Sequence, residues 1–269
     1  GYETHEIVSM VVTSLKPNVF AFHADALEKI SALPGVTSAP LVWGLPLTGN
    51  KSRAPILIDG RPPSNDPQDR IVLPIRQVTP TYFKLMEIAQ RDGRLFDDHD
   101  QKSSAPVAII NEEMARRYFP GENPLGQHLR MPQGKPMEIV GIVGDLRSKG
   151  LNVPVEPEVY LPFFQAPAFS KHLVVRTPMD PVEMAAAVRR ELLRIDPGVI
   201  IEKVKTMDRI RDDSISAQRF TMTVITLFSG LALVLAAVGM YGVISHSVAQ
   251  RTHEIGVRMA IGARSHHIL

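Results

Sequence analysis

A long apolar stretch near the end of this 269-residue chain constrains its fold more than any other feature. Residues Phe220–Val248 contain no Asp, Glu, Lys or Arg, and the central part, Val224–Ile244, reads VITLFSGLALVLAAVGMYGVI. About 20 apolar residues in an α-helix cross the ~30 Å hydrocarbon core of a bilayer, because each residue rises about 1.5 Å. We therefore predict a transmembrane helix over residues 216–249. The alternative, a helix buried in a protein core, is usually shorter and seldom apolar on every side.

The net charge and the absence of cysteine exclude several kinds of partner and site. Thirty Lys plus Arg against 28 Asp plus Glu give a formal charge of +2, so we expect no nucleic acid partner. The chain has no cysteine, which excludes disulfides, Cys-based zinc sites, iron–sulfur clusters and a Cys nucleophile. It opens with GYETHEIV, without an initiator Met or a signal peptide, and stops in what reads as the start of a helix. We therefore expect a fragment of a larger membrane protein.

Residues 1–215 are typical of a globular α+β domain. Apolar and β-branched runs predict strands over residues 7–14, 36–42, 56–58, 71–78, 107–110, 137–143, 158–164, 172–176 and 199–204. Helical spacing predicts helices over residues 22–33, 79–88, 111–119 and 181–195. Thr79, followed by Pro80, and Asn111 are the expected N-caps of the second and third helices. Because strand, helix and strand occur at both ends, we expect two βαβ-like units flanking a β-rich insert.

The sequence contains no recognisable catalytic constellation and no Walker A motif. Gly141-Ile-Val-Gly144-Asp145 lacks the third glycine of a dinucleotide-binding loop, so we interpret it as a strand ending in a turn. Asp97-Asp98-His99-Asp100 could attract a hard cation, but four adjacent residues do not converge on one ion without a dedicated loop. A solvated turn is the favoured interpretation there. For Trp43, packing at a strand end is favoured over a ligand platform.

The segment directly after the apolar stretch, residues 250–264, reads QRTHEIGVRMAIGAR. Glu254 and Arg258 form an i,i+4 pair in the favourable order, which supports a helix. Gly256 lies in the middle of that helix, at a cost of ~1 kcal/mol relative to Ala, and permits the close approach of another backbone. Gly262 suits the end of the helix. We expect a short helix with one apolar and one charged face, which serves either as an ordinary interfacial helix or as a docking helix for a partner.

Small residues recur within the predicted span. Ala232 and Ala236 are four residues apart, and Gly239 and Gly242 add a second narrow patch. Small side chains let membrane helices pack closely, although Ala and Gly are also common filler in such helices. We favour packing against further spans of a bundle.

With these features in view, the stretch SVAQRTHEIGVRMAIGAR resembles the run that follows the second span of MacB/FtsX-type ABC transporter permeases. Further motifs agree in the same order along nearly the whole chain: residues 33–36 (LPGV), 44–47 (GLPL), 59–63 (DGRPP), 78–83 (VTPTYF), 111–112 (NE), 120–126 (PGENPLG), 140–145 (VGIVGD) and 160–162 (YLP). The pattern looks most like the large duplicated permeases of some soil bacteria. Residues 88–94, IAQRDGR, depart from it, since a more apolar run is expected before the Gly-Arg pair.

The resemblance implies a type VII ABC system, whose permease has a first span, a large extracytoplasmic domain and three more spans. Residues 1–215 would be the extracytoplasmic MacB-like core domain, residues 216–249 the transmembrane helix, and residues 250–269 a cytoplasmic coupling loop that begins the FtsX-like permease domain. This places the chain in the bacterial inner membrane, with the residues before about 215 outside the cytoplasm. A separate or fused ATPase would bind ATP and Mg²⁺, so we expect no enzymatic activity and no cofactor in this chain.

The resemblance also implies a surface that couples the chain to that ATPase. Its residues are Arg251, Glu254, Ile255, Gly256, Arg258, Met259, Gly262 and Ala263. The other expected partners are sibling permease spans or a second permease copy, membrane lipid and a periplasmic adaptor. Efflux of a small molecule, release of a lipoprotein and control of a cell-wall hydrolase stay open, because fold and coupling loop are shared while cargo is not. The alternative is a membrane-anchored sensor or envelope-interaction domain without an ATPase; a membrane-tethered enzyme is disfavoured by the lack of catalytic groups.

Overall fold

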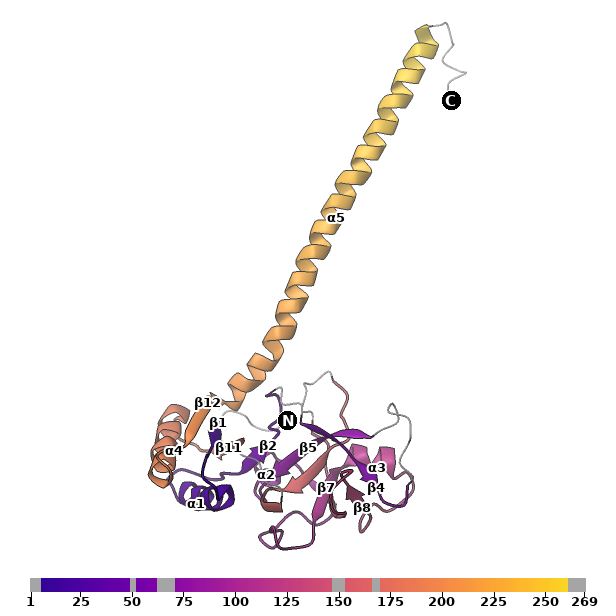
Figure 1. Ribbon diagram of the computed structural model, residues 1–269. Helices are drawn as coiled ribbons and strands as arrows, with labels where there is room; N and C mark the ends of the chain where they lie inside the picture. Colours follow the sequence, from indigo (N-terminus) through magenta and orange to yellow (C-terminus); the bar gives the residue numbers. More distant parts are fainter. Residues whose placement is uncertain (1–5, 49–51, 62–70, 147–152, 166–169, 261–269) are drawn as a thin grey trace. The chain divides into compact units, whose positions relative to one another are not determined.

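The computed structural model describes residues 6–48, 52–61, 71–146, 153–165 and 170–260, and these form two compact units (Figure 1). The first unit covers Gly1–Ser214 and contains every strand of the described chain. The second covers Ile215–Leu269 and consists, where it is described, of helix. The mixed α/β character expected for the first unit is confirmed.

The first unit is built on a large mixed sheet. Its strands are β1 (Ile7–Thr13), β2 (Leu41–Trp43), β3 (Arg53–Pro55), β4 (Leu57–Ile58), β5 (Val72–Val78), β6 (Gln90–Gly93), β7 (Val107–Asn111), β8 (His128–Arg130), β9 (Met137–Val143), β10 (Val159–Pro162), β11 (Ser170–Arg176) and β12 (Ile200–Thr206). The helices are α1 (Val19–Ser31), α2 (Tyr82–Leu85), α3 (Glu112–Tyr118), α4 (Pro181–Ile195) and α5 (Met207–Ala260), with a 3-10 turn, η2, at Phe163–Gln165. Among the described residues the strand order is β12-β1-β11-β2-β5-β10-β7-β9-β8-β4, with β3 beside β5 and β6 beside β9.

The ends of the first unit interleave into one four-stranded sheet, β12-β1-β11-β2. In the β1-α1-β2 segment, β11 lies between the two strands and is antiparallel to both. In the β11-α4-β12 segment, β1 lies between the strands in the same way. Each segment is therefore a split βαβ unit, and the strand of one fills the gap in the other. The chain between β2 and β11 supplies the remaining strands and is called the insert below.

Two apolar layers enclose this four-stranded sheet. Helices α1 and α4 cover one face and lie side by side (Figure 1). The residues packed there include Val8, Met10, Leu41, Leu173 and Val175 from the strands and Phe22, Ile30, Met184, Val188 and Leu192 from the helices. On the other face, Ile7, Val42 and Val174 pack with α2 and with the first turns of α5. The insert has its own core, centred on Ile75, Ile110, Met114, Ile139 and Val159.

Two helix N-caps were expected from the sequence, and the structure confirms one of them. The Asn111 Oδ1 atom accepts a hydrogen bond from the Met114 amide, which confirms it as the N-cap of α3. Thr79 does not cap α2, and this prediction is wrong. The Thr79 Oγ1 atom instead accepts from the Leu41 amide at 3.1 Å, which ties β2 to the end of β5, and α2 begins three residues later at Tyr82.

Candidate functional site

The first candidate functional feature is the junction between the sheet and α5. Strand β12 ends at Thr206 and α5 begins at the next residue, so no loop separates them. The Thr206 Oγ1 atom caps the helix by accepting from the Arg209 amide at 3.3 Å. Met207 is fully buried and Ile210 nearly so, both in the layer that contains Ile7 of β1. The first turns of α5 are therefore part of the core of the first unit.

An ion pair supports the same junction. The Lys205 Nζ atom in β12 lies 2.6 Å from the Asp213 Oδ2 atom in α5. This contact lowers the pKa of Asp213, first through the hydrogen bond from Lys205 and then through its charge. Both side chains are half exposed, so the pair adds little to stability, and the apolar anchor of Met207 dominates.

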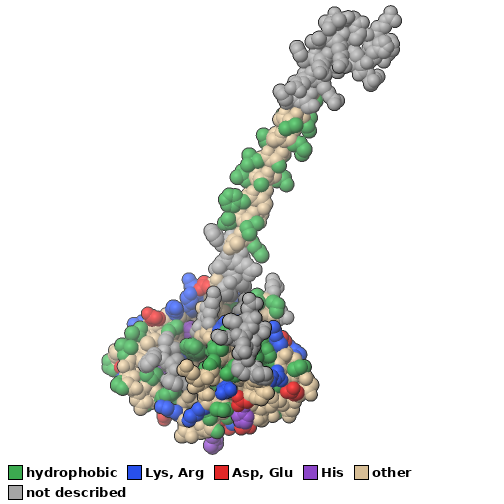
Figure 2. All heavy atoms as spheres, turned by 45° about the vertical axis from the view of Figure 1, so that its right-hand side comes forward, with side chains coloured by type: hydrophobic (Ala, Val, Ile, Leu, Met, Phe, Trp, Pro, Cys, Tyr) green, Lys and Arg blue, Asp and Glu red, His purple; other side chains and the backbone are tan. Residues whose placement is uncertain are grey.

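The second feature is the apolar part of α5, which the second unit contains. Thr221–Ser245 is long and apolar enough to cross a membrane, with a mean hydropathy of 2.2 over its most apolar part, and none of that part is buried. Figure 2 shows hydrophobic side chains along both visible sides of the described part of this helix. Its 25 residues span about 38 Å, more than the ~30 Å hydrocarbon core. A polar group inside it is satisfied locally, since the Thr226 Oγ1 atom donates to the Met222 carbonyl. The alternative of a buried core helix does not fit these exposed side chains.

The small residues predicted for packing lie on one side of this helix. At 100° per residue, the positions Ala232, Ala236, Gly239 and Gly242 fall within an arc of about 120°. All four are exposed, and a Cβ atom added at Gly239 or Gly242 would have no neighbour within 4 Å. Nothing in the described chain therefore accounts for the absence of side chains there. Packing against another span stays a prediction.

The predicted coupling residues lie at the far end of α5. Residues 251–260 continue the helix without a break, so the separate short helix expected after the span is not present as such. The reason is local: from residue 246 to residue 255 there is no Gly or Pro to interrupt the helix. Gly256 lies inside α5, and the positions of Arg251, Glu254, Ile255, Arg258 and Met259 fall within an arc of about 140°. Gly262 and Ala263 lie outside the described residues.

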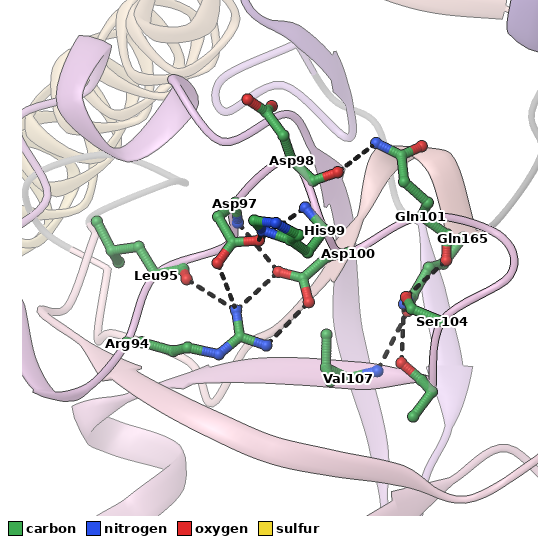
Figure 3. A network of polar contacts seen from close by, with 11 residues as sticks. Arg94, Leu95, Asp97, Asp98, His99, Asp100, Gln101, Ser104, Val107 and Gln165 are labelled. Carbon is green, nitrogen blue, oxygen red and sulfur yellow. Dashed lines mark hydrogen bonds and ion pairs between the residues drawn. The ribbon is translucent and has the colours of Figure 1, made fainter.

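The turn at residues 97–100, Asp-Asp-His-Asp, is built around an ion pair (Figure 3). The Arg94 guanidinium contacts both carboxylate oxygens of Asp100, at 2.8 and 2.9 Å. The Asp100 Oδ2 atom also accepts from the Asp97 amide, and the Asp97 Oδ1 atom accepts from the His99 amide. Because Asp100 is buried, the expectation of a merely solvated turn is wrong for that residue. Within the described residues no group of three His, Asp or Glu side chains is placed to hold a metal ion.

A buried ion pair connects β5 to the residue that precedes β10. The Arg76 Nε and Nη2 atoms lie 3.1 and 2.8 Å from the two carboxylate oxygens of Glu158, and the Tyr160 hydroxyl donates to the same carboxylate at 2.9 Å. The Arg76 Nη1 atom donates to the Gly44 carbonyl. Burial is the largest single influence on the pKa of Arg76 and lowers it, but the charge and hydrogen bond of Glu158, together with Tyr82 and Tyr160, outweigh burial and raise the pKa above its usual value. Burial, followed by the Glu158 charge, raises the pKa of Tyr160. These charges are internally satisfied, so the cluster is structural.

Comparison with known proteins decides the family. Residues 7–195 match the MacB-like periplasmic core domain, which covers well over half of the chain. The chain belongs to this family. The resemblance to MacB/FtsX-type permeases is thereby confirmed, and a MacB-like domain followed by a membrane-spanning helix fits an inner-membrane protein with an extracytoplasmic N-terminal part.

Several relatives share this MacB-like domain. The macrolide export ATP-binding/permease protein MacB of Nitrosomonas europaea is 29% identical over 196 residues, which cover 66% of this chain and 28% of that protein. The uncharacterized ABC transporter permease YknZ of Bacillus subtilis is 27% identical over 195 residues, which cover 70% of this chain and 48% of that protein. The chain thus spans less than half the length of either relative. The crystal structure of the periplasmic region of MacB from Actinobacillus actinomycetemcomitans has the same fold, with a TM-score of 0.52 at 14% identity, covering 78% of this chain and 92% of that one.

Sequence reasoning missed the base of α5 in this MacB-like protein. The helix that contains the predicted span, residues 216–249, already begins at Met207, and its first turns are buried in the sheet unit. The bounds of the span itself stay a prediction. A signal was present: Thr206 is a good N-cap, Asp208 suits the first turn, and Met207 and Ile210 are spaced i,i+3.

Proposed function

We propose that this chain is part of the permease subunit of a type VII ABC transporter, and that it couples ATP hydrolysis by a partner ATPase to movement of the MacB-like extracytoplasmic domain. The observation that carries the proposal is the direct continuation of β12 of the MacB-like domain into α5. Motion of a helix whose first turns are core residues is delivered to the sheet, because Met207 and Ile210 pack against β1. A flexible linker at this point would absorb such motion instead.

The names of the relatives support the same class of protein. The Nitrosomonas europaea relative is a macrolide export ATP-binding/permease protein, and the Bacillus subtilis relative is an ABC transporter permease. In this proposal a separate or fused ATPase binds ATP and Mg²⁺, and residues 251–263 meet it on the cytoplasmic side. Sibling spans pack against the small-residue side of α5. Cargo stays open between small-molecule export, lipoprotein release and control of a cell-wall hydrolase.

The test is purification of the full-length protein from its native membranes in mild detergent, followed by a search for a co-purifying Walker-motif ATPase and measurement of its ATP turnover. Gly256→Leu places a bulky side chain among the predicted coupling positions and should lose the ATPase or its stimulation. Gly230→Leu is the matched control, since it adds the same side chain to the same helix on the side opposite the predicted packing residues, at 100° per residue. It should retain both.

Two outcomes would count against the proposal. If no ATPase accompanies a folded full-length protein, the sensor or envelope-interaction alternative takes its place, and the outer domain is screened for ligands. If the ATPase is retained and stimulated equally in the Gly256→Leu and Glu254→Lys variants, the permease class stands but residues 251–263 are not its coupling surface.

A further inference from the structure

The interior of the first unit contains an amine with no carboxylate beside it in the part of the chain that the structure describes. Lys171 lies in β11 and only 1% of it is exposed. Its ammonium group donates to the Gln77 Oε1 atom and lies 4.5 Å from the centre of the Phe163 ring and 5.8 Å from that of Trp43. Among the described residues no Asp or Glu forms an ion pair with it. A charged ammonium has three donors, and this site offers one amide oxygen and two ring faces.

A second buried base lies beside it. His23 of α1 is 1% exposed, and its Nε2 atom has no hydrogen-bond partner within the described chain. The His23 ring meets the Phe163 ring edge to face, with 5.2 Å between their centres. Burial, followed by the charge of Lys171, lowers the pKa of His23 to about 4. His23 is therefore neutral at neutral pH, and it does not compensate a charge on Lys171.

Lys171 lies where the four-stranded sheet meets the insert. Trp43 of β2 pairs with Gln77 of β5, and the β11–β2 register continues so that Lys171 lies across from Trp43. The β2–β5 pairing joins the four-stranded sheet to the insert, and it consists of two residue pairs, Val42–Val78 and Trp43–Gln77. We call this pairing the seam. Lys171 comes from one side of the seam, whereas Gln77 and Phe163 come from the other.

The groups that face the amine come from every element packed around it. Helix α1 presents His23, β2 presents Trp43, β5 presents Gln77 and η2 presents Phe163. Of these, His23 alone titrates in the accessible pH range. The protonation of Lys171 is therefore opposed by burial, and no acidic group within the described ranges compensates it.

Charged residues on the same elements belong to other contacts. Arg76 on β5 is paired with Glu158. His172, next to Lys171 on β11, lies on the opposite face of the strand and contacts Ser9 at 3.3 Å. The acidic and basic residues of α1 occupy exposed or partly exposed positions: Asp25, Glu28 and Lys29.

We propose that Lys171 makes the seam acid-sensitive: the neutral amine keeps the insert packed against the four-stranded sheet, and protonation loosens the contact of β2 with β5 and of Phe163 with α1. The physical reason is that the ammonium group needs further acceptors, which only entering water can provide once the packing opens. Burial lowers the pKa of Lys171 to about 7, so the change falls near neutral pH. The inference concerns the MacB-like domain alone and does not depend on an ATPase.

Trp43 offers a direct readout, because it is the single tryptophan of the chain and lies beside the amine. Its fluorescence would be recorded between pH 5.5 and 9.5 on the full chain in detergent. The wild type should show a transition with a midpoint near pH 7, and Lys171→Met should abolish it. The matched control is Lys102→Met, which removes an amine lying 5.6 Å from another ring, that of Phe20. This control, like His23→Gln, should leave the transition in place.

Hydrogen exchange tests the opening itself. After correction for the intrinsic pH dependence of exchange, amides of β2 and β5 should exchange about tenfold faster below the midpoint than above it in the wild type. Lys171→Arg keeps its charge at every pH, so in this variant the amides of β2 and β5 should exchange fast throughout the pH range. This variant keeps the test decisive if Lys171→Met does not fold. A fluorescence transition that survives Lys171→Met, one that His23→Gln abolishes, or an unchanged exchange rate across the midpoint would each overturn the proposal.

Discussion

Replacing Met207 by Ala tests whether α5 is anchored in the sheet unit. Met207 is the first residue of α5, is 0% exposed, and packs in the layer that includes Ile7, Val42 and Val174. The substitution removes three heavy atoms from a filled interior. Their transfer from water contributes about 2 kcal/mol, and the cavity left behind adds to this, so we expect a loss of about 3 kcal/mol in the free energy of unfolding.

The assay is urea unfolding of the full chain in detergent, followed by the fluorescence of Trp43 in β2. With an m value of about 2 kcal/mol/M, the expected loss lowers the urea midpoint by roughly 1.5 M. Met222→Ala provides the control, because it removes the same atoms from the same helix at a residue that is 59% exposed. We expect that control to change the free energy by less than about 0.5 kcal/mol.

Equal midpoints for the Met207→Ala and Met222→Ala variants would refute the reasoning. That result would mean that the first turns of α5 contribute nothing to the core of the first unit. The direct continuation of strand into helix would then be a connection without mechanical consequence, and the main structural support for the proposed function would be lost.

Three further predictions concern the first unit. Glu158→Gln should cost about 3–5 kcal/mol in urea unfolding because it leaves the buried Arg76 charge unpaired, while the Arg76→Met/Glu158→Met double variant should cost less; a larger cost for the double variant would contradict this. Asn111→Ala should lower the free energy of unfolding by about 1 kcal/mol or more, since it removes the α3 cap. Asn111→Asp should not restore it, because its carboxylate would replace the amide that donates to Asp145. The free energy of unfolding should fall by up to about 1.4 kcal/mol per pH unit from pH 10.5 to 7, because the unfolded chain binds a proton at Lys171 that the folded chain does not. Below pH 7 the contribution of Lys171 to this pH dependence should level off, and Lys171→Met should abolish the decrease between pH 10.5 and 7.

The elements with strong periodicity could be predicted from the sequence. Strand β9 and helix α4 have the bounds expected, Met137–Val143 and Pro181–Ile195, because alternation in the one and a clear apolar face in the other leave no competing interpretation. The apolar helix could be predicted for the same reason, since no soluble element needs so many uncharged residues in succession. Local pattern and tertiary context agree in these segments.

Other elements depend on partners that the sequence does not reveal. Strand β6, Gln90–Gly93, is exposed and polar, and it forms only because it pairs with the edge of β9. This pairing explains how the polar run at residues 88–94 replaces the apolar one expected from the family. Strand β2 is shorter than expected, Leu41–Trp43 rather than residues 36–42, because its partners β11 and β5 each extend only two residue pairs along it.

The polar interior was the least predictable part. Nothing local to Lys171 indicates burial, since it lies among residues, SKHLVVR, that read as an ordinary strand with a polar start. Its surroundings come from four other elements that meet only in the folded chain. The coupling and packing residues are different. The family resemblance suggested the coupling residues, and spacing in the sequence suggested the packing residues. Helix geometry groups those that the structure describes on sides of α5, and their roles stay predictions.

The place where the insert leaves the four-stranded sheet has a consequence for how such domains diversify. The chain departs at the end of β2 and returns at the start of β11, and these strands are antiparallel neighbours, with Val42 opposite His172. Departure and return are therefore adjacent in space, although more than a hundred residues separate them in the sequence. Such a detour can lengthen, shorten or be exchanged without moving either attachment point. Evolution can thus alter the surface of the insert while β12 continues into α5 in the same way.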